Sequence, residues 1–412
     1  MTTARQSDIA VVGAGVIGAS IAAELASRGA RVTVFDRGEL GGGATAEGMG
    51  HLLFLADSPA QFELIGRSME LWDQLLPDLP PGCEVDKCGT LWLAADDEDL
   101  ATAHEKTEGL RRFGVEAEVV DANQLRAIEP ALAHDLLGAM RVPEDAVIYP
   151  PRVVSYWLHE SPAANRITVR AHETVAELAP AELAPAELAP AGLAPPELAN
   201  AGVTPSGGAA SSRGPSPRLR VEGGDWESYS AIVIASGVGT AKLLPEVGIQ
   251  PRKGHLAITD RYPGFLRHQV VELAYVKNTH MGEGDSVSMN VQPRSTGQVL
   301  IGSCRQFAGF DRSVDPVITK RMIDQAIRYI PPIQSLQVIR IWTGFRPASP
   351  DDRLGPGRRA AVVFIASGHE GLGITSALGT AELLVDLVAG AEPHVSPALY
   401  DPAARLAGKE EA

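Results

Sequence analysis

Hydrophobic and polar residues along the chain fall into blocks that predict strands and helices in turn. Residues 9–12 form a short apolar run that predicts a buried strand, and residues 16–28 follow with a helical period. A second apolar run over residues 31–35 predicts another buried strand. Glycines fill the turn between the first strand and the helix. We therefore expect the N-terminal segment to fold as a β-α-β unit.

A longer amphipathic helix is predicted to follow residue 58. Ser58 can cap it, Pro59 suits its first position, and Gln61 completes a capping-box pattern. The apolar residues of the helix recur every three or four positions, and Pro77 ends it. These apolar residues are Phe62, Ile65, Met69, Trp72 and Leu76.

The rest of the chain continues the alternation of strands and helices. A strand, a Gly-rich turn and a helix close it, and alternating strands are expected over residues 254–303. Strands are also expected over residues 89–95, 115–120, 167–175, 218–222, 231–235 and 361–366, and helices over 97–113 and 316–330. The apolar face of the last helix comprises Ile374, Leu378, Ala381, Val385 and Val388.

Residues 179–217 are predicted to be a flexible low-complexity insertion between two strands. The repeat AELAP begins at Ala176, Ala181 and Ala186 and then decays into a segment rich in Gly, Ser, Pro and Arg. A proline at every fifth position prevents a continuous helix, because each one removes a donor and clashes one turn back. No periodic apolar face remains to bury this segment.

Composition and charge exclude several classes of protein. The 412 residues carry a formal net charge of −15, which argues against nucleic-acid binding because that requires basic surfaces. No apolar run reaches the ~18 residues of a membrane span, and no secretory signal is visible at the N-terminus. Three cysteines exclude a disulfide scaffold, so a cytoplasmic location is expected.

The turn after the first strand carries a dinucleotide-binding pattern. Gly13, Gly15 and Gly18 have Gly-x-Gly-x-x-Gly spacing, and Asp36 ends the next strand. The first glycine permits a tight turn, the second lets the backbone approach a diphosphate, and the third allows close packing of the helix. The helix N-terminus offers N–H donors to the diphosphate, and Asp36 can accept hydrogen bonds from ribose hydroxyls.

NAD and FAD both use this pattern, and two later features favour FAD. The loop at Ala44 and Thr45 lies just downstream, where a second segment can reach along the diphosphate. Residues 367–374, SGHEGLGI, supply another Gly-rich turn between a strand and a helix. An extended flavin dinucleotide held by segments scattered over the chain explains why the first and last segments are both Gly-rich.

Five stretches resemble the D-amino-acid oxidase superfamily of flavoproteins, on the branch with glycine oxidase, sarcosine oxidase and bacterial D-hydroxyproline dehydrogenases. The pairing of GFRP at residues 344–347 with GHEGLGIT at 368–375 is the most specific part. The resemblance implies an α/β fold with a Rossmann-like FAD-binding domain and a mixed-sheet substrate domain. The stretches are residues 8–37, 41–51, 231–237, 331–357 and 364–390.

The resemblance also implies roles for two segments near the C-terminus. The arginine of the family's GxRP motif binds the substrate carboxylate, which implies this role for Arg346, and a rigid guanidinium fork suits it. The turn at 368–374 resembles the loop whose N–H groups face the pyrimidine side of the flavin, where negative charge accumulates on reduction. Glycine oxidases carry a second arginine in this loop. Gly371 stands in its place here, which weakens a glycine or sarcosine assignment.

Residues 48–51 and 368–375 look most like those of D-hydroxyproline dehydrogenases, which oxidise a cyclic secondary amine. His51 is interpreted as a contact for a substrate hydroxyl, as a base, or as a structural histidine. Asn290 lies near the position where the family often presents a pocket tyrosine. Together with Arg346 these two are the candidate catalytic residues, and His255 and His369 are further candidates for substrate contact.

FAD is expected to be bound without a covalent link, because neither Cys304 nor any histidine lies in an attachment motif. Cys83 and Cys88 have the spacing of flavin disulfide reductases but the wrong context, and no metal site is expected. The residues expected to contact FAD are Gly13, Ala14, Gly15, Val16, Ile17, Gly18, Asp36, Arg37, Ala44, Thr45, Gly48, Met49, Gly50, Val175, Ala235, Ser236, Gly237, Gly344, Gly368, His369, Gly371, Leu372, Gly373 and Ile374.

The expected activity is oxidation of a D- or secondary amino acid at its Cα–N bond by hydride transfer to flavin. The preferred substrate is cis-4-hydroxy-D-proline ahead of D-proline, and the product is a pyrroline-2-carboxylate. Quinone, oxygen and another carrier stay open as electron acceptors. The alternatives are a glycine- or sarcosine-type oxidase and a flavin-holding subunit of a larger dehydrogenase. The expected FAD-binding domain comprises residues 1–85, 144–250 and 340–412, and the substrate domain 86–143 and 251–339.

Overall fold

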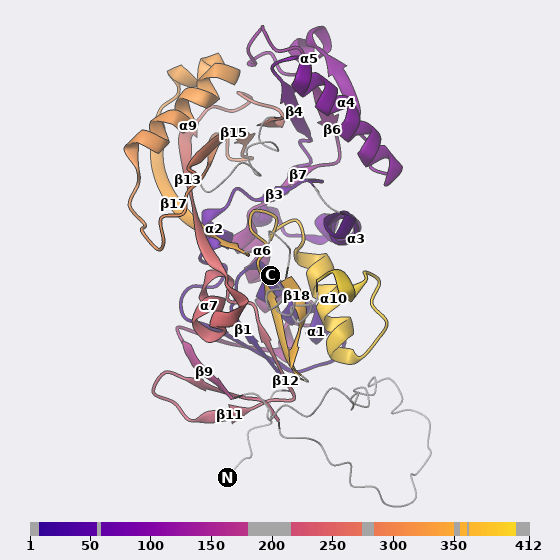
Figure 1. The fold of residues 1–412 in the computed structure, drawn as a ribbon, viewed down its shortest axis with the longest axis vertical. Coiled ribbons are helices and arrows are strands. Elements are labelled where there is room, and N and C mark those ends of the chain that lie inside the picture. Colours follow the sequence, from indigo (N-terminus) through magenta and orange to yellow (C-terminus); the bar gives the residue numbers. More distant parts are fainter. Residues whose placement is uncertain are drawn as a thin grey trace, which may run out of the picture.

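The protein has two lobes, each built around its own β-sheet (Figure 1). The computed structural model describes residues 8–55, 59–179, 216–273, 284–349, 355–360 and 362–400. A six-stranded sheet forms the lower lobe in this view, and an eight-stranded sheet forms the upper one. The predicted α/β class with one Rossmann-like sheet and one mixed sheet is therefore confirmed.

The lower sheet has the strand order β18-β19-β12-β1-β2-β8. Its neighbours pair in parallel except at the edge, where β18 runs antiparallel to β19. The four residues of β1 are all buried, as a central strand covered on both faces requires. The strands are β1 (Ile9–Val12), β2 (Val32–Asp36), β8 (Ile167–Ala171), β12 (Ala231–Ile234), β18 (Gly355–Ala360) and β19 (Val363–Ser367).

Helices and a small sheet cover the two faces of the lower sheet. α1 (Val16–Ser27) packs against α6 (Pro150–His159) and α10 (Ala377–Ala389), and one hydrophobic cluster joins these helices to alternate strand residues. The opposite strand residues pack against a three-stranded antiparallel sheet. That sheet comprises β9 (Val175–Ala179), β10 (Arg218–Val221) and β11 (Trp226–Ser228).

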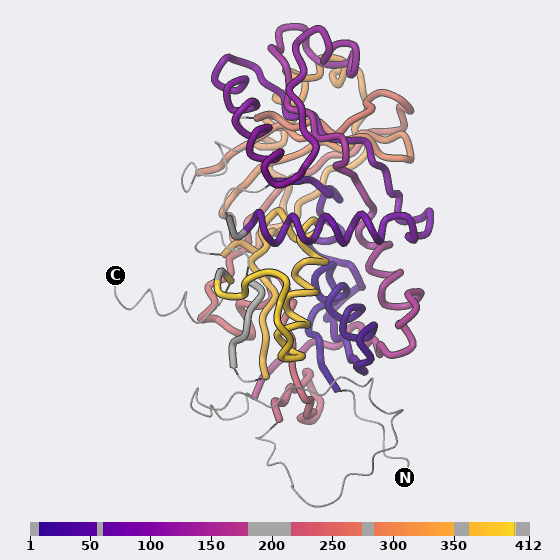
Figure 2. The backbone as a smooth tube through the Cα atoms, turned by 90° about the vertical axis from the view of Figure 1, so that its right-hand side faces the viewer, coloured from indigo at the N-terminus to yellow at the C-terminus, as the bar shows by residue number. Residues whose placement is uncertain are grey.

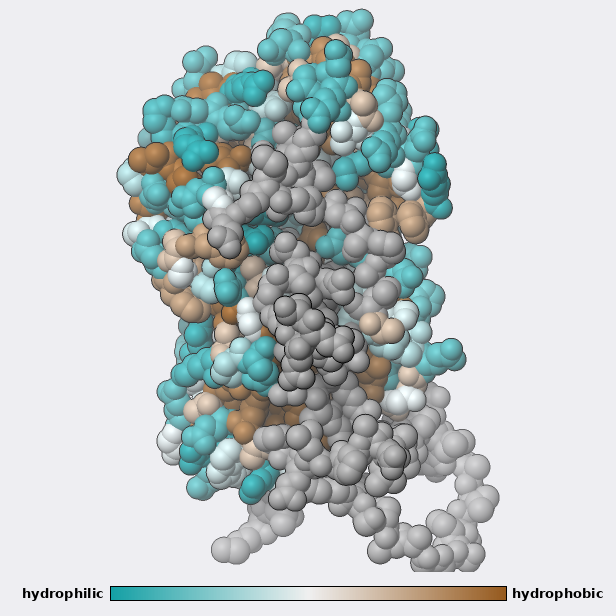
Figure 3. Space-filling view, viewed as in Figure 1, coloured by the Kyte–Doolittle hydropathy of each residue, from teal (hydrophilic) through white to brown (hydrophobic). Residues whose placement is uncertain are grey.

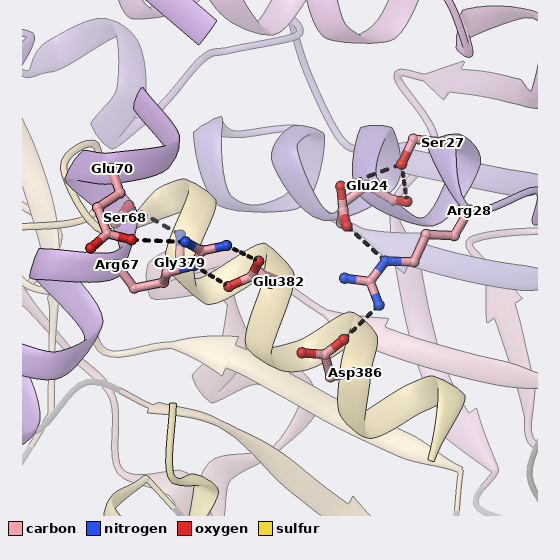
Figure 4. Close-up of polar contacts among 9 residues, drawn as sticks. All are labelled: Glu24, Ser27, Arg28, Arg67, Ser68, Glu70, Gly379, Glu382 and Asp386. Atoms are coloured by element: carbon pink, nitrogen blue, oxygen red, sulfur yellow. Dashed lines mark hydrogen bonds and ion pairs between the residues drawn. The ribbon is translucent and has the colours of Figure 1, made fainter. Parts of the chain in front are cut away.

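Helix α3 (Pro59–Leu75) lies across the junction of the two lobes (Figure 2). Polar contacts attach it to α10, as Figure 4 shows. Arg67 binds Glu382 with two N–H groups, at 2.8 and 2.7 Å, and the Ser68 hydroxyl accepts a hydrogen bond from Gly379 N at 3.0 Å. Because α10 follows the C-terminal turn, these contacts fix that turn against the junction.

The upper sheet has the strand order β17-β13-β16-β15-β14-β4-β6-β5. Its neighbours are antiparallel except for β14 and β4, which makes it the predicted mixed sheet. α9 (Pro316–Tyr329) packs on β15 and β16, whereas α4 (Asp97–Arg112) and α5 (Ala122–Ile128) pack at the other end. The strands are β4 (Thr90–Ala94), β5 (Glu118–Asp121), β6 (Gly138–Val142), β13 (Gln250–Arg261), β14 (Gln269–Glu272), β15 (Ser286–Pro293), β16 (Gln298–Arg305) and β17 (Val338–Ala348).

Two short elements lie between the lobes. β3 (His51–Leu52) pairs with β7 (Ala146–Val147), and α2 (Ala44–Glu47) contacts β17. A further short helix, α7 (Thr240–Leu243), follows β12. These elements bring the loop after β2 close to the long strands β13 and β17.

Two predictions of local structure are wrong. Residues 167–175 form two strands rather than one, because the backbone turns at His172, which has a positive φ of 61°, before β9 joins the three-stranded sheet. The C-terminal helix begins at Ala377, so the Gly-rich turn lies one turn ahead of the helix and not at its N-terminus. The Ser58 cap and residues 180–215 of the predicted insertion lie outside the described residues.

The predicted division into domains stays a proposal. Its boundary at residue 340 falls within β17, which pairs with β13 along nearly its whole length. Within the described part of the chain, no helix combines the length and apolarity needed to cross a membrane. Hydrophilic side chains cover most of the coloured surface in Figure 3, with hydrophobic patches between them.

A buried carboxyl group makes the stability of the fold depend on pH. Asp145, between β6 and β7, is 1% exposed, and its Oδ1 accepts a hydrogen bond from Phe54 N at 3.1 Å. Burial raises the pKa of Asp145 from its usual 3.8 to about 7. The folded state therefore holds this proton more tightly than the unfolded state, so the contribution of Asp145 to stability is fully present below about pH 4 and is lost as the pH rises through 7.

We expect Asp145→Asn to stabilise the protein above pH 7 by about 2 kcal/mol, because an amide fills the same space without a buried charge. Below pH 4 the variant and the parent should unfold at the same urea concentration. Urea unfolding across pH 4–9 measures the difference between them. A gain of the same size at both ends of this range would show that the charge of Asp145 is not its cause.

Candidate active site

A cavity of about 470 Å³ runs from the first Gly-rich turn to the C-terminal turn and the long strands of the upper sheet. Gly13 and Asp36 line it in the lower lobe, and Asn290 lines it in the upper lobe. Arg346 and Gly371, from the last fifth of the chain, also line it. Segments separated by more than 300 residues thus enclose one elongated space.

The first turn leaves no room for side chains at two of its three glycines. Gly13 has a φ of +110°, and a Cβ there would lie 2.4 Å from the carbonyl oxygen of Ala235. A Cβ on Gly18 would lie 1.8 Å from the carbonyl oxygen of Gly13, so this glycine seats α1 against the turn. Gly15 lines the cavity, and a Cβ there would meet only the hydroxyl of Thr45, at 3.2 Å. The three positions therefore have the steric roles that the pattern predicts.

Asp36 and Thr45 close this end of the cavity. The Asp36 carboxylate accepts hydrogen bonds from Ala14 N at 2.7 Å and from Gly38 N at 2.8 Å. Thr45 Oγ1 accepts a hydrogen bond from Val16 N, at the start of α1, at 3.0 Å. Asp36 still has lone pairs for a ribose hydroxyl, since each carboxylate oxygen has two.

The C-terminal turn, residues 368–374, contributes to the cavity lining. His369, Glu370, Gly371, Gly373 and Ile374 line the cavity. His369 Nε2 lies 3.1 Å from the hydroxyl of Thr380, and burial lowers the pKa of His369 to about 4, so the ring is neutral at physiological pH. The turn is also held from α3, because Ser68 Oγ and Trp72 Nε1 both donate to the carbonyl oxygen of Thr375.

Arg346 extends from β17 into a notch that the missing side chain of Gly254 leaves open. Gly254 and Gly344 face each other across β13 and β17; a Cβ on Gly254 would lie 2.6 Å from Arg346 Nη1. Among the described residues, one contact holds the guanidinium, from Nη1 to the carbonyl oxygen of Cys304 at 3.0 Å. The remaining N–H groups form a fork that suits a carboxylate. Asp351 and Asp352, which could pair with this arginine instead, lie outside the described residues.

Glu370 is a site residue that the sequence prediction missed. Its carboxylate lies 3.4 Å from Arg252 and 3.5 Å from Arg305. Burial tends to raise the pKa of Glu370, but Arg305, Arg346 and Arg252 together lower it below its usual value. An ionised carboxylate thus shares the field of three arginines beside the substrate end of the cavity. The sequence feature that could have revealed Glu370 is its position inside the GHEG motif.

His51 and Asn290 meet at the end of the cavity in the upper lobe. His51 Nδ1 lies 2.5 Å from Gln269 Oε1, and His51 Nε2 lies 3.0 Å from Asn290 Nδ2. Burial, with a smaller effect of the nearby Arg294, lowers the pKa of His51 to about 4. Because both ring nitrogens already have partners, His51 does not act as a base unless one of these bonds breaks.

Five predicted contact residues do not line the cavity. Ala14 is fully buried in the core, and Gly18 abuts the backbone of the turn. Leu372 packs toward a cluster of the upper lobe, and Gly368 precedes the part of the turn that reaches the cavity. The ring of His255 is engaged by Cys304 Sγ and by the Asp315 N–H group, away from the cavity. The other predicted residues line it: Gly13, Gly15, Val16, Ile17, Asp36, Arg37, Ala44, Thr45, Gly48, Met49, Gly50, His51, Val175, Ala235, Ser236, Gly237, Asn290, Gly344, Arg346, His369, Gly371, Gly373 and Ile374.

Several lining residues had no sequence motif to reveal them. Glu47 of α2 accepts a hydrogen bond from Arg312 at 2.6 Å, and both line the cavity with Leu256 and Ser303. These residues come from α2, β13, β16 and the loop after β16. Cys83 is buried, Cys88 has its pKa raised by burial to about 12, and neither lines the cavity. A redox pair at the site therefore has no structural support.

Over nearly its whole length, the chain is similar to glycine oxidases and to a hydrogen cyanide synthase subunit. It is 27% identical to the glycine oxidase of Pseudomonas aeruginosa, over 97% of this chain and 99% of that protein. It is 26% identical to the hydrogen cyanide synthase subunit HcnC of the same organism, over 93% of each chain. The crystal structure of glycine oxidase from Geobacillus kaustophilus superposes with a TM-score of 0.77 at 25% identity, over 97% of this chain and 98% of that one.

The shape of the cavity and the groups that line it are suited to FAD. Gly15 exposes its backbone to the cavity, the N-terminus of α1 opens into the cavity, and Asp36 stands at the end of β2. The cavity continues from there to the C-terminal turn, as a dinucleotide with an isoalloxazine ring requires. The family profile described as FAD dependent oxidoreductase matches residues 8–387. The chain therefore belongs to this family and is an FAD-dependent oxidoreductase.

Proposed function

We propose that the protein oxidises a D- or secondary amino acid at its Cα–N bond, with cis-4-hydroxy-D-proline as the preferred substrate and a pyrroline-2-carboxylate as product. The observation that carries this proposal is the Arg346 fork in the same cavity as the dinucleotide turn. The similarity to glycine oxidases over nearly the whole chain supports the class of reaction.

The residues of the site would bind and orient the substrate. The Arg346 guanidinium would hold the carboxylate, which fixes the position of Cα. Apolar and neutral side chains such as Met49 and Leu256 would exclude water around it. Bound FAD supplies the acceptor for the hydride from Cα, while the nitrogen loses a proton and the C–N bond becomes a C=N bond.

The preference for a cyclic secondary amine is supported by Gly371 and Asn290. A Cβ on Gly371 would be 3.9 Å from Arg346 Nε, so the loop leaves the arginine fork open on this side. Gly371 stands where the family resemblance implies a second arginine for glycine oxidases. Asn290 and His51 offer polar contacts at the other side of the cavity.

Anaerobic bleaching of the flavin tests this function. The purified protein is mixed with cis-4-hydroxy-D-proline, D-proline, sarcosine and glycine, each in turn, and the absorbance of the flavin is followed. We expect the fastest bleaching with the first of these. If none of these amino acids bleached the flavin, the proposed function would be wrong.

Glycine- or sarcosine-type oxidation is the second candidate, because the glycine oxidases match over nearly their full length. It predicts faster bleaching by glycine or sarcosine, with oxygen consumption in air. The match to a cyanide synthase subunit favours a third, in which the chain works within a larger assembly. This third candidate predicts that the isolated chain turns over only after host extract is added.

A further inference from the structure

We propose that Asn290 Oδ1 is the acceptor in the cavity for a hydrogen-bond donor carried by the substrate, and that Gln269 and His51 fix its orientation. The inference rests on the proposed function, because it assumes that an amino acid occupies the cavity. The donor is an amine N–H group or a hydroxyl group, and the experiment below distinguishes the two.

The backbone sets the direction of the chain of hydrogen bonds. Gln269 Nε2 lies 3.3 Å from the carbonyl oxygen of Ala146, which can only accept. The amide nitrogen of Gln269 must therefore face Ala146, and the amide oxygen must face His51. Because Oε1 accepts, the proton of the imidazole lies on Nδ1, 2.5 Å away.

The protonation of His51 determines the orientation of the Asn290 amide. A neutral imidazole carries one N–H group, so Nε2 of His51 is an acceptor once Nδ1 holds the proton. Asn290 Nδ2, at 3.0 Å, is then the donor to Nε2. Burial holds the pKa of His51 at about 4, so the ring keeps this single proton in neutral solution.

The chain of bonds ends in an acceptor that has no partner. Asn290 is 7% exposed and lines the cavity, and its Oδ1 is buried without a hydrogen bond to any described residue. A buried acceptor without a donor is unfavourable, whereas a donor in the cavity would complete its bonding. A ligand that presented an acceptor to Asn290 would be repelled, since the amide cannot turn without breaking its bond to His51.

Two non-oxidisable ligands of the same shape test this acceptor in the FAD-loaded protein. Pyrrole-2-carboxylate carries a ring N–H group where furan-2-carboxylate carries a ring oxygen. Their dissociation constants are measured from the change in the flavin absorbance spectrum, without turnover. We expect the pyrrole to bind about tenfold more tightly than the furan, because only the pyrrole satisfies the buried acceptor.

Three variants distinguish the role of Asn290 as the acceptor from the role of Gln269 in orienting it. Asn290→Leu removes the acceptor, and we expect the ratio of the two dissociation constants to fall to about one. Gln269→Leu leaves Asn290 in place but frees the His51 proton and the amide orientation, so the ratio should fall as well. Gln292→Leu is the control, because Gln292 is a buried amide on the same strand, bonded to the carbonyl oxygen of Met49, outside the cavity lining. Its ratio should equal that of the parent.

The hydroxyl arm compares KM values for cis-4-hydroxy-D-proline and D-proline in the parent and in Asn290→Leu. If Asn290→Leu loses the preference for the hydroxylated substrate but keeps the pyrrole-to-furan ratio, Asn290 accepts from the hydroxyl group. If it keeps that preference but loses the ratio, Asn290 accepts from the amine. The proposal is overturned if Asn290→Leu keeps its flavin and changes neither ratio, or if neither carboxylate binds the parent. Failure of the proposed function is a separate result, because it appears as absent bleaching while the two dissociation constants are still measured.

Discussion

Replacing Arg346 by Leu is expected to lower kcat/KM for the amino-acid substrate by about 10²- to 10³-fold, because a desolvated carboxylate would lose its charged partner. The loss should affect KM and kcat together, since the same contact binds the substrate and orients Cα. Arg346→Lys keeps the charge without the planar fork, so its kcat/KM should lie between that of the parent and that of Arg346→Leu. Anaerobic flavin reduction at increasing substrate concentration measures both constants.

A matched arginine on the same strand controls for the loss of charge. Arg340 is exposed on β17, its guanidinium lies over the ring of Trp342, and it does not line the cavity. Arg340→Leu should therefore leave kcat/KM unchanged. All three variants should retain the flavin spectrum, which shows that the dinucleotide site is intact. A change of less than threefold in Arg346→Leu would refute the assignment of the carboxylate site.

The dinucleotide half of the site could be predicted because its determinants are local in sequence. Gly13, Gly15 and Gly18 lie within six residues, and the closest atom to a Cβ on Gly18 is the carbonyl oxygen of Gly13, within the same turn. Asp36 follows at the end of the next strand, so one β-α-β unit contains the whole pattern. The residue spacing of such a unit fixes its geometry, which is why these roles could be anticipated.

The substrate half depends on contacts between distant segments, which residue spacing does not encode. His51, Gln269 and Asn290 come from three strands and meet through side-chain hydrogen bonds. Glu370 acquires its place from Arg252 and Arg305, which lie on two further strands. Arg346 could be named only because a family motif marks it, and its notch depends on Gly254 in the neighbouring strand β13.

The wrong prediction of a single strand over residues 167–175 has an identifiable physical cause. The run of residues 167–175 has the apolar pattern of one strand, and no glycine or proline marks the turn at His172. The turn exists because β8 pairs with β2 while β9 pairs with β10, in different sheets. Tertiary pairing therefore decided the end of the strand.

The second large effect is expected at Gly18, where the structure separates a steric role from a ligand role. A Cβ at this position would lie 1.8 Å from the Gly13 carbonyl oxygen, and a backbone atom cannot move aside as a side chain can. We expect Gly18→Ala to lower the free energy of unfolding of the FAD-free protein by about 3 kcal/mol or more and to weaken FAD binding at least tenfold. Urea unfolding and flavin fluorescence titration measure the two quantities.

Two other glycines make this expectation specific. Gly15 lines the cavity, and a Cβ there would press only on the side-chain Oγ1 of Thr45, at 3.2 Å, so Gly15→Ala should weaken FAD binding while destabilising the FAD-free protein much less than Gly18→Ala. Gly109 lies within α4, and a Cβ there would meet nothing within 4 Å. Gly109→Ala should therefore stabilise the protein by up to about 1 kcal/mol through helix propensity. If Gly18→Ala instead left the unfolding free energy unchanged or raised it, as expected for Gly109→Ala, the close approach of α1 to the turn would not be needed for stability or for FAD binding.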